Sequence, residues 1–78
     1  MKVQILGTGC AKCRQLYANA DQAIKAAGLD AELEKVEKIQ EILAFGVMAT
    51  PALAVDGKVK SAGRLLSADE IKRILGAA

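Results

Sequence analysis

The segment GTGCAKC, residues 7–13, joins two stretches of different periodicity. Before it, residues 2–6 (KVQIL) form a short apolar run with β-branched side chains, which favours a buried strand. After it, apolar residues recur at helical spacing as far as Gly28, a typical helix stop. These positions are Cys13, Leu16, Tyr17, Ala20, Ala23, Ile24 and Ala27. The segment therefore predicts a strand, a tight turn and a helix whose start carries both cysteines of the chain, Cys10 and Cys13.

The spacing of Cys10 and Cys13 favours redox chemistry over a structural role. Residues three apart lie on one helical face, close enough for a disulfide. Such a small ring stabilises a fold little, while a helix N-terminus favours a thiolate. Cys10 precedes the first turn and should be exposed, so we expect it to be the attacking sulfur. Cys13 begins the buried stripe and would resolve the mixed disulfide, and Lys12 adds positive charge beside the site.

Other uses of the two cysteines stay open from their spacing alone. They could be small apolar residues of a redox-inert interaction module. A tetrahedral zinc site needs about four ligands, whereas the chain has two cysteines and no histidine, so only a metal-bridged dimer could complete one. The stronger alternative is a soft-metal carrier that holds Cu(I) between two thiolates. Residues 9–13 resemble the loop of heavy-metal-associated domains, which end in a strand. We expect no bound metal.

The middle of the chain predicts a strand, a short helix and a hairpin. Residues 30–36 alternate polar and apolar side chains, as in a half-buried strand. Residues 39–46 read as a short helix that ends at Gly46, because three apolar residues fall at i, i+3 and i+4. These are Ile39, Ile42 and Leu43. Residues 52–55 and 59–62 form two strands of a hairpin, because Asp-Gly at residues 56–57 is a strong two-residue turn signal.

A capping box opens the last helix, with Ser67 as N-cap and Glu70 three residues later. Its inward residues are Ile71, Ile74 and Leu75. The predicted element order is therefore βαβαββα. A helix between the first two strands implies parallel pairing, and the hairpin implies an antiparallel pair. We expect an α/β fold with a mixed four-stranded sheet and three helices that cover both faces.

Length and composition limit the class of protein. A chain of 78 residues, 53% hydrophobic, can form one folded domain over residues 1–78 and is too apolar to be disordered. A net charge of +2 and two aromatic residues provide neither a basic stripe nor a stacking platform for nucleic acid. No apolar run approaches the roughly 20 residues of a membrane span, and residues 1–6 do not resemble a signal peptide. We expect a cytoplasmic monomer that binds neither nucleic acid nor a membrane.

The cysteine motif and a distant proline together resemble the thioredoxin superfamily, in particular its small glutaredoxin-like redox-active disulfide proteins of archaea and bacteria. The matching segments are CAKC (residues 10–13), VMATPAL (47–53), DGKV (56–59) and AGR (62–64). The resemblance covers nearly the whole chain and implies a thioredoxin-like fold. It also implies that the Thr50–Pro51 peptide bond is cis, that Pro51 packs against the disulfide, and that the Thr50 backbone hydrogen-bonds the bound partner.

The resemblance further implies thiol–disulfide exchange with disulfide-containing protein substrates. Electrons would come from an upstream reductase or a small thiol, and no tightly bound cofactor is needed. An apolar rim around Cys10, formed by Ala49, Thr50 and Gly63, would dock the partner.

The chain departs from the family pattern at three places. Residues 11–12 are Ala-Lys, where thioredoxins have Gly-Pro and glutaredoxins often have Pro-Tyr. The first strand has no acidic residue, so Gln4 is the nearest polar candidate for the buried carboxylate of thioredoxins. Near the last helix, residues 62–63 with Ser67 or Asp69 match the glutathione-binding pattern of glutaredoxins only loosely. The redox potential and the use of glutathione therefore do not follow from the resemblance.

Overall fold

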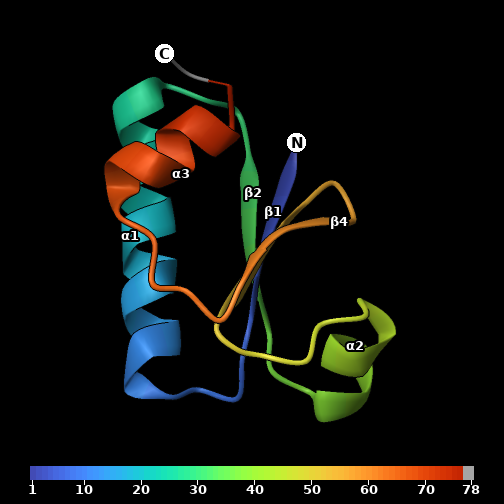
Figure 1. The fold of residues 1–78 in the computed structure, drawn as a ribbon. Coiled ribbons are helices and arrows are strands. Elements are labelled where there is room, and N and C mark those ends of the chain that lie inside the picture. Colours follow the sequence, from blue (N-terminus) through green and yellow to red (C-terminus); the bar gives the residue numbers. More distant parts are fainter. Residues whose placement is uncertain (77–78) are drawn as a thin grey trace.

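The computed structural model describes residues 1–76 as a sheet with helices on both faces (Figure 1). The elements in chain order are β1 (Lys2–Leu6), α1 (Ala11–Ala27), β2 (Glu32–Val36), α2 (Ile39–Ala44), β3 (Ala52–Val55), β4 (Lys58–Ala62) and α3 (Ala68–Ile74). This order confirms the predicted βαβαββα arrangement and α/β class. β2 begins at Glu32 instead of residue 30, because its first partner in β1 is Lys2. β4 begins at Lys58, one residue earlier than predicted.

The sheet is mixed, with strand order β2-β1-β3-β4. β1 is parallel to β2 and antiparallel to β3, and β3 is antiparallel to β4. The hairpin between β3 and β4 turns at Asp56 and Gly57, whose φ angles are 51° and 83°. Two consecutive positive φ angles are typical of the type I′ turn that Asp-Gly favours. The parallel crossover and the tight hairpin are both confirmed.

The two faces of the sheet carry separate parts of the core. α1 and α3 cover one face and α2 lies on the other (Figure 1). Side chains alternate along β1, so Val3 and Ile5 face α1 and α3, whereas Leu6 lies in the core under α2. As the second strand in the order, β1 is flanked on both sides, and its carboxyl end leads directly into residues 7–13.

α1 carries the predicted apolar stripe toward the sheet and α3. Its buried residues are Cys13, Leu16, Ala20, Ala23 and Ile24. Tyr17 and Ala27, predicted in the same stripe, are partly buried. Gly28 ends the helix with φ 65°, and its N–H donates to the carbonyls of the last turn. Within residues 1–76, no helix is both long and apolar enough to cross a membrane.

α2 packs on the sheet through few residues. Ile42 is buried, while Ile39 and Leu43 are 63% and 62% exposed. A six-residue helix has fewer than two full turns and presents a narrow inner face. Phe45 and Val47, which follow the helix, complete the contact with the sheet. The predicted short helix is present, but of the three apolar residues that indicate it only Ile42 contributes to the core.

The predicted capping box is present at the start of α3. The Ser67 hydroxyl accepts from the Glu70 N–H at 3.1 Å, and the Glu70 carboxylate accepts from the Ser67 N–H at 3.0 Å. Ile71 and Leu75 are buried and Ile74 is partly buried against α1 and the sheet. The last element of the described chain is thus a helix that covers the same face as α1.

Candidate active site at the start of helix α1

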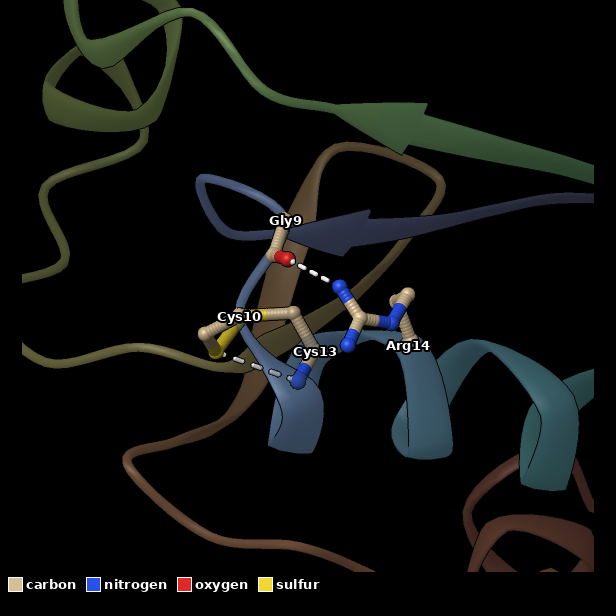
Figure 2. The surroundings of a disulfide bond; sticks show 4 residues. All are labelled: Gly9, Cys10, Cys13 and Arg14. Atoms are coloured by element: carbon tan, nitrogen blue, oxygen red, sulfur yellow. Dashed lines mark hydrogen bonds between the residues drawn. A yellow bond between two sulfur atoms is a disulfide. The ribbon is translucent and has the colours of Figure 1, made fainter.

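Cys10 is the N-cap of α1 and is exposed. Its backbone is extended, with φ −68° and ψ 167°, and its carbonyl accepts from the Arg14 N–H at 3.0 Å. Its Sγ accepts a hydrogen bond from the Cys13 backbone N–H at 3.2 Å (Figure 2). A sulfur in this position faces the free N–H groups and the positive end of the helix dipole, which stabilise a thiolate.

Cys13 lies one turn further into the helix and is only 6% exposed. It forms a disulfide with Cys10, and the two Cα atoms are 5.0 Å apart (Figure 2). The two sulfurs therefore differ in access, as the sequence predicts: one reaches solvent and the other lies at the edge of the core. A disulfide with one exposed sulfur can exchange with a thiol from outside and keep its second sulfur protected.

The charged residues in the first turn of α1 are positive. The first turn of α1 contains no acidic residue. Lys12 is exposed, and within residues 1–76 its ammonium forms no ion pair. The Arg14 guanidinium folds back toward the loop before the helix and donates from Nη1 to the Gly9 carbonyl at 2.8 Å (Figure 2). Both side chains make the start of this helix electropositive.

Gly7 makes a close approach that sequence reasoning did not assign to the site. A Cβ placed on Gly7 would overlap the Cys13 Sγ and lie 3.1 Å from the Cys13 Cβ. The φ angle of Gly7 is not positive, so its backbone conformation does not require glycine. Glycine is favoured here because there is no room for a side chain. Sequence alone indicated a turn at this glycine, and no local pattern shows which side chain returns to it.

The segment before β3 lies against this loop. The Thr50–Pro51 peptide bond is cis, Pro51 is buried and Thr50 is exposed. A Cβ added to Gly7 would lie 3.9 Å from the Thr50 Cβ and would overlap the Cys13 sulfur. The segment that carries Thr50 is therefore close to the buried sulfur. The structure thus brings together two segments that are far apart in the sequence, around Cys13 and around Thr50.

Gly63 holds the same segment from the other side. Its N–H donates to the Pro51 carbonyl at 2.9 Å. Its φ is 75°, and a Cβ at this position would lie 3.0 Å from the Cβ of Ala49. A side chain at Gly63 would therefore meet both an unfavourable backbone conformation and a crowded neighbour. Gly63 packs directly on the loop that carries Thr50.

Gln4, the polar candidate in the first strand, points away from the disulfide. Val3 and Ile5 face α1, so Gln4 between them faces the opposite side of the sheet. Its Nε2 donates to the Glu34 Oε1 at 3.0 Å, and this hydrogen bond, with Lys2 at 3.3 Å, lowers the pKa of Glu34 below its ordinary value. Gln4 therefore supplies no polar group to Cys13.

Comparisons with known proteins agree with this arrangement. A family model described as a thioredoxin domain matches residues 1–76. The chain is similar to a thioredoxin of Methanothermobacter thermautotrophicus, with 53% identity over 75 residues that cover 96% of this chain and 97% of the relative. It is also similar to a thioredoxin of Methanocaldococcus jannaschii, with 41% identity over 73 residues that cover 94% of this chain and 84% of the relative. Both similarities extend over most of each chain.

Proposed function

The chain belongs to the thioredoxin domain family, and we propose that it reduces disulfide bonds in partner proteins. Its family and the Cys10–Cys13 disulfide make it a thiol–disulfide oxidoreductase. The observation that carries the proposal is the contrast between the two sulfurs: Cys10 is an exposed N-cap, and Cys13 is almost fully buried in the same helical turn. This contrast supports different roles for the two residues in one exchange reaction.

In the first step, the Cys10 thiolate attacks one sulfur of the partner's disulfide. A bond forms between Cys10 and that sulfur, the partner's S–S bond breaks, and its other sulfur leaves as a thiolate. In the second step, the Cys13 thiolate attacks the Cys10 sulfur, and the partner's remaining sulfur leaves. The two electrons that reduce the partner come from the dithiol, which ends as the Cys10–Cys13 disulfide.

The surface around Cys10 would hold the partner in line with this sulfur. Thr50 is exposed close to the contact between Gly7 and Cys13, and Pro51 is buried. Gly63 braces the segment through its hydrogen bond to the Pro51 carbonyl and its contact with Ala49. These residues form the proposed docking rim, and Lys12 adds an exposed positive charge next to the attacking sulfur.

Turnover requires that the disulfide be reduced again. We propose an upstream reductase or a small thiol as the electron donor, the cytoplasm as the compartment, and a monomer as the working form. The donor can be identified by mixing the oxidised protein either with thioredoxin reductase and NADPH, or with glutathione, glutathione reductase and NADPH. Consumption of NADPH above the background of one of these mixtures identifies the donor.

The position of the last element favours redox exchange over the soft-metal carrier. The order of heavy-metal-associated domains ends in a strand, whereas the last described element here is α3, on the same face as α1. The alternative, in which the two cysteines carry a soft metal, can be tested by measuring the metal content of the protein and the effect of a chelator.

The proposed activity can be tested with insulin as a model disulfide substrate and dithiothreitol as reductant. The wild-type protein should accelerate the precipitation of the released insulin chain. Cys10→Ser should lose this acceleration completely, because the remaining sulfur, that of Cys13, is buried. Equal acceleration by wild type and Cys10→Ser would contradict the proposal.

A further inference from the structure

A cavity of about 170 Å³ lies behind the disulfide. Cys13 lines it and Cys10 does not. Its other uncharged walls come from the end of β1 and the following turn, at Ile5, Gly7 and Gly9. Of the two cysteines, only the buried one therefore contributes to the wall of this cavity.

Three charged side chains line this cavity: Arg14 from α1, Lys35 from β2, and Glu37 just after β2. Neither the loop at Gly7 nor the neighbouring Thr50 adds a charge. The cavity thus contains two positive groups and one negative group at neutral pH. In the described part of the chain, none of the three forms an ion pair with another residue.

All three residues are exposed, and Arg14 and Lys35 each make a local contact. The Arg14 guanidinium donates to the Gly9 carbonyl at 2.8 Å (Figure 2). The Lys35 ammonium lies 4.8 Å from the centre of the Tyr17 ring, within the range of a cation–π contact. The Glu37 Oε2 lies 3.3 Å from the Cβ position of Gly9.

We propose that Arg14 is a positioning residue that, together with Lys35, stabilises the thiolate of Cys13 from behind, and that Glu37 opposes them. This inference rests on the proposed function, because it concerns the step in which Cys13 attacks the Cys10 sulfur of the mixed disulfide. In that step the Cys10–Cys13 bond forms, the bond from Cys10 to the partner breaks, and the partner leaves as a thiolate.

The physical reason is that burial disfavours the ion that the reaction requires. A thiolate at the edge of the core lacks the hydration that it would have in water, so burial disfavours ionisation and raises the pKa of the thiol. Nearby cations offset this cost, and their effect is stronger beside a buried group than in open solvent. Arginine is always protonated, so Arg14 provides a charge that does not depend on pH.

The first experiment titrates Cys13 alone. In a Cys10→Ser background, position 10 is uncharged, as it is in the mixed disulfide. The thiolate absorbance near 240 nm then reports Cys13 once the contribution of the Tyr17 phenolate, followed near 295 nm, is subtracted. Arg14→Gln and Lys35→Gln should each raise the pKa of Cys13 by about half a unit to one unit. Glu37→Gln should lower it by a similar amount. Arg14→Lys keeps the charge and should restore most of the wild-type value.

Lys38→Gln is the matched control, because Lys38 is exposed, follows Glu37 and does not line the cavity. It should leave the pKa of Cys13 unchanged. Equal shifts for Lys38→Gln and Arg14→Gln would show a general charge effect and overturn the inference. So would a Glu37→Gln variant whose Cys13 pKa rises, or no shift in any of the three cavity variants.

The second experiment measures the resolving step in the protein with both cysteines. The reduced protein is mixed with 4,4′-dithiodipyridine, and two molecules of thiopyridone are released. Attack by Cys10 releases the first and resolution by Cys13 releases the second. Arg14→Gln should shift the pH profile of the second release upward and slow it about threefold to tenfold at neutral pH. An unchanged pH profile for the release of the second thiopyridone would contradict the inference.

The insulin assay and the titration of Cys13 distinguish failure of the proposed function from failure of this inference. A wild-type protein that fails to reduce insulin would contradict the function, whatever the titration of Cys13 shows. A protein that reduces insulin normally but has an unchanged Cys13 pKa in the cavity variants would retain the function and lose the inference.

Discussion

At the scale of single residues, the chemistry of this protein depends on two sulfurs in one helical turn with opposite access to solvent. Cys10 is exposed at the N-cap, and Cys13 packs beneath it with 6% of its surface exposed. A different cation is assigned to each sulfur. Lys12 is exposed and does not line the cavity beside Cys13, whereas Arg14 lines it. Substitutions of these two cations should therefore affect different steps.

Lys12→Glu should raise the pKa of Cys10 by about one unit, because an attractive charge becomes a repulsive one. The thiolate exists only in the reduced protein, so the variant should also be more reducing. Measurement of the pH dependence of Cys10 alkylation by iodoacetamide at low salt, together with a redox titration, checks both effects. An unchanged or lower pKa would mean that the helix N-terminus alone controls the thiolate.

Gly7→Ala should destabilise the protein, because the added methyl group overlaps the Cys13 sulfur. Overpacking of this kind typically costs about 1–3 kcal/mol. Urea unfolding of the oxidised protein measures the change, and Thr8→Ala, at the exposed next residue, is the control. Equal stability of the Gly7→Ala variant and the wild type would show that the site adjusts without cost.

At the scale of elements, the last helix depends on its capping box. Hydrogen bonds from Ser67, followed by the charge of Arg64, lower the pKa of the Glu70 carboxyl. A lowered folded-state pKa means that ionised Glu70 stabilises the fold above its ordinary pKa, and that this contribution disappears as the pH falls through the folded-state value.

Ser67→Ala should therefore cost about 1 kcal/mol near neutral pH, and the difference from the wild type should narrow in acid. Glu70→Gln keeps a hydrogen-bond acceptor without the charge, so its stability should depend less on pH between 3 and 5. Urea unfolding from about pH 3 to 7 provides the comparison. A Glu70→Gln variant that loses stability in acid as steeply as the wild type would contradict the coupling.

The elements differ in how well the sequence predicts them. β1, α1 and the hairpin follow from local signals: a β-branched run, a long apolar stripe ending at Gly28, and an Asp-Gly turn. The orientation of α2 does not follow, because its helical spacing allowed three inward residues, whereas its short length and its contact with the sheet bury only Ile42. Tertiary packing decides burial in an element of this size.

At the scale of the whole molecule, the site forms where distant segments meet. The pairing of Cys10 with Cys13 is visible in the sequence because the two lie on one helix. The contacts between Gly7 and Cys13, and between Gly63 and Ala49, depend on how loops from different strands converge. The cavity behind Cys13 has the same origin, since Arg14 and Glu37 come from different elements. No local pattern encodes these contacts.

Chelation tests the metal alternative for the whole molecule. Because the two cores are apolar, the protein should fold without a metal. Under reducing conditions it should contain less than one zinc or copper per chain, and its melting temperature should not change with a chelator. One tightly bound metal per monomer or per dimer, lost together with stability on chelation, would support the carrier.

The most direct test of the central claim is covalent trapping of the exchange intermediate. Reduced Cys13→Ser is mixed with oxidised insulin and separated on a non-reducing gel, with reduced Cys10→Ser as the comparison. Cys13→Ser should form a mixed disulfide through Cys10 that mass spectrometry identifies and dithiothreitol releases, while Cys10→Ser should form none. Equal trapping by both variants, or trapping only by Cys10→Ser, would contradict the assignment of Cys10 as the attacking sulfur.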